Sequence, residues 1–101
     1  MSTAETWAND NLNSFKQRMR ISTNDSDELA NLTDMLIASY TSILRLVGVP
    51  DASDPEVKEL IFERSRYTYN DALDEFKDNY KQNIRDVFLA NQPTDDVGET
   101  Q

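Results

Sequence analysis

The sequence predicts an all-α fold, a small bundle of three to four helices with a flexible N-terminal arm and a flexible C-terminal tail. Three observations lead to this prediction. Apolar residues recur at steps of three and four over two long stretches. Gly48 and Pro50 separate these stretches, and no segment alternates as a β-strand does. The 101 residues suit one domain, which we assign to residues 9–90, with the arm at 1–8 and the acidic tail at 91–101.

The composition argues against several classes of function. A net charge of −9 disfavours general binding to nucleic-acid phosphates or to an anionic membrane surface. The absence of Cys and His excludes disulfides, thiolate chemistry, imidazole catalysis and ordinary zinc sites. No signal peptide and no apolar run of the ~20 residues that span a bilayer is expected. Because no Ser–Lys or carboxylate arrangement stands in for the missing groups, we expect no enzyme, no cofactor and no metal.

The first helix is predicted to follow the arm. Residues 1–8 are polar apart from Trp7, which either packs locally on the first helix or inserts into a neighbouring molecule; local packing is favoured. Asn9 or Asp10 is expected to cap a helix that runs through Arg20. The apolar edge of that helix consists of Leu12, Phe15 and Met19.

The second helix has clear signals at both ends. Asp25 and Glu28 resemble a capping box that starts the helix near Ser26, and Gly48 stops it before Pro50. Its main apolar line is Leu29, Leu32, Leu36, Tyr40, Ile43 and Val47. Flanking residues make this line wider than one contact face requires. We therefore expect a central helix that is touched from two sides, or one that is partly buried between subunits.

The third helix is predicted as one long element over Val57–Phe76. Asp54 can cap it, and Pro55 suits its first position. Its stripe is Val57, Ile61, Ser65, Tyr69, Ala72 and Phe76. The apolar pattern then continues to about Ala90, either in the same helix or after a break near Asp78–Asn79; the break is favoured. The short connection over residues 49–54 favours antiparallel neighbours.

Like charges repeat at steps of four along this stretch. The acidic pairs are Glu59 with Glu63 and Asp71 with Glu75, and the basic line is Lys77, Lys81 and Arg85. Each like pair destabilises an isolated helix by about a few tenths of a kcal/mol. Two interpretations stay open: a screened surface without a partner, or a head-to-tail interface that joins acidic and basic faces of neighbouring subunits. A second line, Leu60 and Tyr67 with Arg64 between them, is either a subunit contact or a shoulder of the core.

Three stretches, in this order, resemble the small head–tail connector proteins of long-tailed bacteriophages, which are also called adaptor or head-completion proteins. They are Arg20–Leu29 after a short amphipathic helix, the apolar-Gly-x-Pro turn Val47–Pro50, and Asp54–Phe76. The most specific part is the run Glu-Arg-Ser-Arg-Tyr-Thr-Tyr-Asn-Asp-Ala-Leu-Asp-Glu-Phe over residues 63–76. The resemblance extends over residues 10 to 90.

The resemblance implies a structural protein of the virion that acts at the head–tail interface and is present in the host cytoplasm during assembly. Such subunits form a ring, here expected to have twelve members, below the portal protein. The ring extends the DNA channel, lets DNA pass without specific binding, and docks the next connector or stopper protein. An isolated subunit of this kind can stay monomeric until a portal templates the ring. The resemblance implies neither catalysis nor a membrane partner.

Candidate contact residues follow from the off-stripe part of the third helix, which core packing is not expected to need, and from the basic line. The candidate subunit interface is Glu63, Arg64, Arg66, Tyr67, Asn70, Asp71, Lys77, Lys81 and Arg85. The candidate portal-contacting tail is Gln92, Pro93, Thr94, Asp95, Asp96 and Val97. The rival hypothesis is an acidic DNA mimic or regulatory protein that binds a nucleic-acid-binding partner. The net charge fits that rival, but the basic line interrupts the continuous negative face that a mimic needs.

Overall fold

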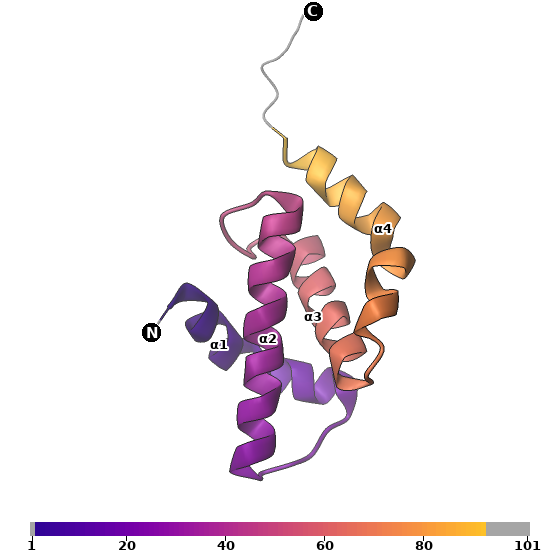
Figure 1. Cartoon of the computed structure of the whole chain (residues 1–101). Helices are drawn as coiled ribbons and strands as arrows, with labels where there is room; N and C mark the ends of the chain where they lie inside the picture. The colour runs from indigo at the N-terminus through magenta and orange to yellow at the C-terminus, as the bar shows by residue number, and fades with distance from the viewer. Residues whose placement is uncertain (1, 93–101) are drawn as a thin grey trace, which may run out of the picture.

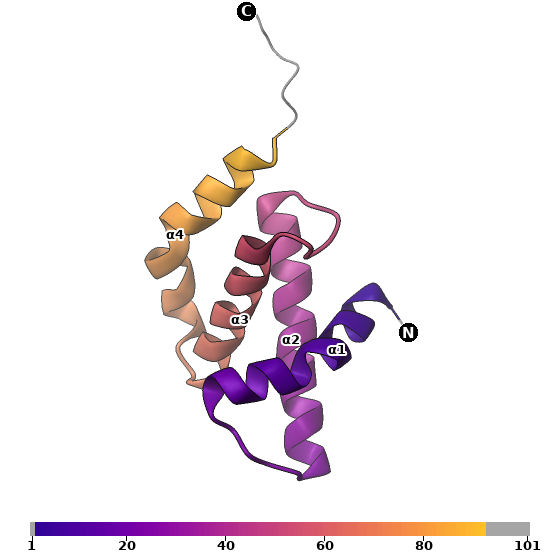
Figure 2. The ribbon, with the colours of Figure 1, turned by 180° about the vertical axis from the view of Figure 1, so that it is seen from behind.

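The computed structural model describes residues 2–92, which form four helices and no strand (Figure 1). The helices are α1 (Thr3–Met19), α2 (Ser26–Val47), α3 (Pro55–Tyr69) and α4 (Leu73–Ala90). α2 and α3 run antiparallel, and α4 packs against both of them. Figure 2 shows that α1 lies across the α2–α3 pair. The predicted small all-α bundle is confirmed.

The ends of α2 and the start of α3 lie where the capping signals predicted them. The Asp25 carboxylate accepts the Glu28 N–H at 3.0 Å, and the Asp54 carboxylate accepts the Glu56 N–H at 2.9 Å. Gly48 ends α2 with φ 70°, a conformation that glycine adopts without a steric penalty. Each cap satisfies a backbone group that would otherwise lack a partner at a helix end.

The predicted flexible arm over residues 1–8 is wrong, because α1 begins at Thr3. The Ser2 hydroxyl accepts the Glu5 N–H at 3.1 Å, and the Glu5 carboxylate accepts the Ser2 N–H at 2.8 Å. This reciprocal pair is a capping box, which starts the helix seven residues before Asp10. The extra turns bury Ala8 completely, so the N-terminal residues form part of the folded domain.

The predicted single helix over Val57–Phe76 is also wrong, because the chain turns back at residues 70–72. Asp71 takes a left-handed conformation with φ 59°, and the Ala72 N–H closes the turn on the Tyr67 carbonyl at 2.8 Å. The break expected at Asp78–Asn79 is absent, and α4 runs through that point. The turn at residues 70–72 sends α4 back along α3, so that Phe76 and Tyr80 pack against Tyr67. The ring centroid of Tyr67 lies 5.7 Å from that of Phe76 and 5.7 Å from that of Tyr80.

The core has two parts, and α2 contributes to both. Between α2, α3 and α4 lies a cluster that contains Tyr40, Ile43, Val47, Val57, Leu60, Ile61, Phe76 and Val87. Beneath α1 lies a second cluster that contains Ala8, Phe15, Leu32, Leu36 and Phe62. The wide apolar line of α2 therefore reflects a central helix that is contacted from two sides within one subunit.

Trp7 joins the two parts of the core. Its ring centroid lies 5.3 Å from that of Tyr40 and 6.0 Å from that of Phe62, and the side chain is half-buried. Trp7 therefore packs within its own subunit, which is the favoured of the two predicted alternatives. The contact anchors the first turns of α1 to both α2 and α3.

Replacing Trp7 with Ala should lower the free energy of unfolding by about 2–4 kcal/mol, because the substitution leaves a gap between Tyr40 and Phe62. Urea titration followed by circular dichroism measures this loss. Thr3→Ala, at an exposed position of the same helix, is the control and should change stability by less than about 0.5 kcal/mol. If Trp7→Ala behaves like the control, the N-terminal segment does not pack as described.

Candidate functional site

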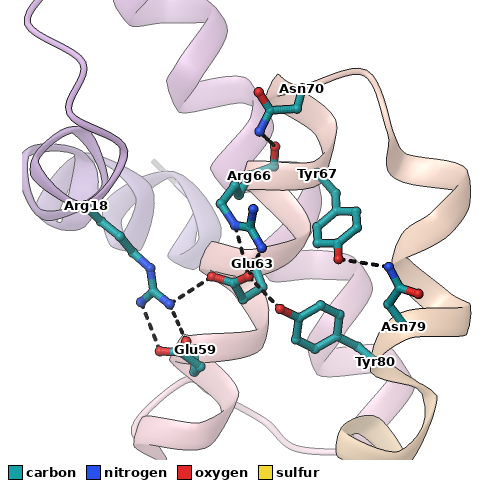
Figure 3. Close-up of polar contacts among 8 residues, drawn as sticks. All are labelled: Arg18, Glu59, Glu63, Arg66, Tyr67, Asn70, Asn79 and Tyr80. Atoms are coloured by element: carbon teal, nitrogen blue, oxygen red, sulfur yellow. Dashed lines mark hydrogen bonds and ion pairs between the residues drawn. The ribbon is translucent and has the colours of Figure 1, made fainter.

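Two of the predicted interface residues on α3, Glu63 and Arg66, meet in a polar cluster centred on Glu63 (Figure 3). We call Arg18, Glu59, Glu63, Arg66 and Tyr80 the Glu63 cluster. Glu63 is 6% exposed, yet its carboxylate accepts hydrogen bonds from three helices. Arg18 of α1 donates to Oε2 at 2.8 Å, Arg66 of α3 donates twice to Oε1 at 3.0 and 2.6 Å, and the Tyr80 hydroxyl of α4 donates to Oε1 at 2.6 Å.

Glu63 is therefore part of the fold, and the expectation that core packing does not need it is wrong. A buried carboxylate is costly unless charged or polar donors surround it. Here the donors come from helices on both sides of α3, so the same carboxylate connects α1 and α4 to the central pair. Glu59, four residues earlier, also binds Arg18, which offsets the like-charge repulsion along α3.

The Glu63 carboxylate is ionised at neutral pH, and the Tyr80 hydroxyl stays protonated. Burial alone would raise the pKa of Glu63, but the hydrogen bonds from Arg66 and Tyr80 and the charges of Arg66 and Arg18 outweigh it and lower that pKa. Burial raises the pKa of the Tyr80 hydroxyl, and its bond to Glu63 raises it further. The bond from Arg18 to Glu59 raises the pKa of Arg18. At neutral pH the cluster thus pairs two carboxylates with two guanidinium groups.

Two further predicted residues of α3 also make contacts inside the subunit. Tyr67 packs edge-on against Phe76 and Tyr80, and its hydroxyl accepts the Asn79 amide at 3.0 Å. Leu60, on the same line, is 3% exposed. The line that contains Leu60 and Tyr67 is therefore a shoulder of the core, which was one of the two predicted alternatives.

Arg64 lies between α2 and α3, where Nη1 donates to the hydroxyl of buried Ser39 at 3.1 Å. Burial lowers the pKa of this guanidinium. No carboxylate within residues 2–92 forms an ion pair with it. Asn70 and Asp71 are exposed in the turn between α3 and α4, at one end of the bundle. These three residues keep polar groups at the subunit surface or close to it.

The predicted basic line, Lys77, Lys81 and Arg85, is exposed along α4. None of its members takes part in an ion pair within the described part of the chain. Two of them line a depression of about 310 Å³ between α2 and α4, which we call the basic groove. Its lining residues are Leu46, Lys77, Asp78, Lys81 and Ile84.

A second depression, of about 240 Å³, lies between α3 and α4, and we call it the acidic groove. Its lining residues are Glu56, Glu59, Leu60, Tyr80, Asn83, Asp86 and Val87. It borders the Glu63 cluster through Glu59 and Tyr80. Charge thus separates across α4 rather than along it, with three carboxylates on one flank and two lysines with one carboxylate on the other.

Four large apolar side chains remain exposed, at the two ends of α4. Tyr69 (45% exposed) and Leu73 flank the turn before α4, and Phe88 and Leu89 (54%) lie in its last turns. This pattern could not be predicted from one continuous helix over residues 57–76, in which Tyr69 belongs to the apolar stripe. Gln92 is exposed, and the remaining predicted tail residues, Pro93 to Val97, lie outside the described residues.

Neither a metal site nor a membrane segment emerges from residues 2–92. These residues contain no group of three or more acidic side chains arranged to hold a metal ion. Their helices also lack the combination of length and apolar character that crossing a membrane requires. No protein-family model, curated protein or solved structure matches this chain.

Replacing Glu63 with Gln should destabilise the protein by about 2–3 kcal/mol at pH 7, because Arg18 and Arg66 lose a buried ionic partner. Folding lowers the pKa of Glu63, so the stability that the carboxylate contributes is present above its ordinary value of 4.5. It is lost as the pH falls through the lower value of the folded state. The difference in stability between the parent and Glu63→Gln should therefore shrink below pH 4.5.

Chemical denaturation at a series of pH values tests this prediction. Glu59→Gln is the matched control, because Glu59 has the same chemistry and shares Arg18, but its side chain is 54% exposed. Its loss should stay below about 1 kcal/mol. Equal losses in the two variants, or a difference from the parent that does not change with pH, would contradict the assigned role of Glu63.

Proposed function

We propose that this chain is a head–tail connector subunit of a long-tailed bacteriophage. In this role, copies form a ring below the portal, extend the DNA channel and dock the next connector or stopper protein. The resemblance of residues 63–76 to that family suggests the role. The observation that carries the proposal furthest is the pair of oppositely charged grooves on the two flanks of α4.

Two different and complementary patches on one subunit suit a head-to-tail contact. Such contacts join unlike surfaces and close into a ring when the rotation between neighbours allows it. The basic groove has Leu46 and Ile84 among its lysines, and the acidic groove has Leu60 and Val87 among its carboxylates. Each groove therefore offers apolar area as well as charge. Charges alone would be screened by salt, whereas this combination is typical of surfaces that bind a partner.

The shape of the subunit agrees with this role. The smallest extent of the subunit is 17 Å, so its helices form a thin layer with broad faces. Broad faces offer the area that a stable contact needs, about 800 Å² on each partner. Contact between neighbours through α4 would also bury its lysines. The remaining acidic surface then suits a channel wall, because it offers passing DNA few cations to bind.

The exposed apolar residues give the ring two distinct ends. Phe88 and Leu89 lie at the end of α4 from which the acidic tail continues, so this end is assigned to the portal. Tyr69 and Leu73 lie at the opposite end, beside the turn between α3 and α4, and are assigned to the next connector or stopper protein. Exposed apolar groups of this kind are typical of surfaces that a partner covers.

Native mass spectrometry tests the connector proposal. The full chain is mixed with the portal protein encoded in the same genome, and the expected result is a portal complex that carries several copies of this chain. The chain alone is measured in parallel as the reference for its own oligomeric state. Absence of any portal complex, together with tight binding to a DNA-binding protein, would contradict the proposal and favour an acidic DNA mimic.

Charge reversal on α4 tests the proposed contact between subunits. The double variant Lys81→Glu/Arg85→Glu should keep the circular dichroism spectrum of the parent, because both residues are exposed and form no ion pair within residues 2–92. It should load fewer copies onto the portal in the same experiment, by tenfold or more. Arg45→Glu, at an exposed position of α2 outside both grooves, is the control and should load as the parent does. Normal loading of the double variant would rule out this contact.

A further inference from the structure

The basic groove has the chemical character of a site for an acidic peptide with an apolar residue. Lys77 and Lys81 line it without an ion-pair partner among residues 2–92, and Asp78 is the one acid in its lining. Leu46 and Ile84 supply apolar surface between α2 and α4. Arg85, one helical turn beyond Lys81, extends the positive charge toward the end of α4.

The chain itself carries a segment of matching chemistry directly after this helix. Beyond Gln92 the sequence continues Pro-Thr-Asp-Asp-Val-Gly-Glu-Thr-Gln over residues 93–101, which lie outside the described residues. The segment has three acidic residues and no basic residue, and Val97 lies between its acids. The charge of the segment is opposite to that of the basic groove. Its one aliphatic side chain, Val97, suits the apolar part of the groove lining, Leu46 and Ile84.

The distances allow the segment to reach the groove of its own chain. Pro93 cannot continue the helix, so a reversal over residues 92–94 is available to the backbone. Lys81 lies nine residues before the last residue of α4, which is ~14 Å along a helix at 1.5 Å per residue. An extended chain covers the same ~14 Å in four to five residues at ~3.3 Å per residue.

This spacing gives a specific register. If the chain reverses over residues 92–94, this spacing would bring Asp96 level with Arg85, Val97 level with Ile84 and Glu99 level with Lys81. Gly98 would give the backbone freedom between Val97 and Glu99. Asp96 and Glu99 would thereby be matched to Arg85 and Lys81, which have no ion pair within residues 2–92, and Asp95 has no partner in this register.

We propose that residues 93–101 fold back in the isolated subunit and occupy the basic groove of the same chain. The attachment of the segment to α4 gives it an effective concentration of the order of millimolar, so the groove is mostly covered when the charge pairs and the Val97 contact together give an intrinsic dissociation constant below about 1 mM. The docking itself is independent of the connector proposal. Its consequence rests on that proposal: a portal that takes up the tail would uncover the basic groove for the neighbouring subunit.

Paramagnetic relaxation in solution NMR tests the docking. The chain has no Cys, so Thr100→Cys introduces a single site for a nitroxide label in the full chain. At low salt we expect selective broadening of the amide signals of Leu46, Lys81 and Ile84. We expect none at the N-terminal end of α1, which lies on the opposite side of α2 from α4 (Figures 1 and 2). The broadening should decrease several-fold in 1 M NaCl, where screening shortens the Debye length to ~3 Å.

Charge variants of the labelled chain identify the contact. Lys81→Glu/Arg85→Glu should abolish the selective broadening, whereas Arg45→Glu, with the same kind of charge change outside the groove, should retain it. Adding Asp96→Lys/Glu99→Lys to the double variant should restore it. Amide signal dispersion checks that each variant is folded.

Several results would overturn the inference. One is broadening that spreads evenly over all surfaces, and another is broadening that the groove variant leaves unchanged. A third comes from a mixture of labelled chain without ¹⁵N and unlabelled ¹⁵N chain: broadening of equal size there would make the occupant the tail of a second copy. None of these measurements includes a portal protein. A negative result here would therefore overturn the tail docking without affecting the connector proposal, which the mass spectrometry tests.

Discussion

The carboxylate of Glu63 is the constraint on which the arrangement of the helices depends. It is buried in α3, where a charge without partners would be strongly unfavourable. The chain resolves this by bringing Arg18 from α1 and Tyr80 from α4 to the same group. Both outer helices are thereby positioned with respect to α3, and the apolar packing of Trp7 and Phe76 acts in the same direction.

This constraint separates the residues that build the subunit from those that are available to partners. Most of the run that resembles phage connectors, from Glu63 through Tyr67 to Phe76, is occupied by internal contacts. The surfaces left for partners lie on α4 and at its two ends, where the basic side chains form no ion pair within residues 2–92 and large apolar side chains are exposed. Under the connector proposal, contacts with partners therefore use these surfaces rather than the run itself.

Local signals in the sequence predicted both ends of α2 and the start of α3, but neither the start of α1 nor the turn between α3 and α4. Short-range caps mark these ends: Asp25 and Gly48 for α2, and Asp54 for α3. The Ser2–Glu5 capping box was present but precedes a weakly patterned segment. The turn at Asp71 has neither Gly nor Pro, and aromatic packing across α3 and α4 determines it. The burial of Glu63 depends on donors 45 residues before it and 17 residues after it, a relation that no local pattern contains.

If one carboxylate joins α1 to α4, Arg18 and Tyr80 are energetically coupled through it, and a double-mutant cycle between Arg18→Ala and Tyr80→Phe measures this coupling. The two side chains belong to different helices and share Glu63 as their acceptor. We expect a coupling free energy of at least about 0.5 kcal/mol, which disappears when the cycle is repeated in the Glu63→Gln background. Additivity within about 0.3 kcal/mol with Glu63 present, or coupling that persists without the carboxylate, would show that Glu63 does not join the two helices.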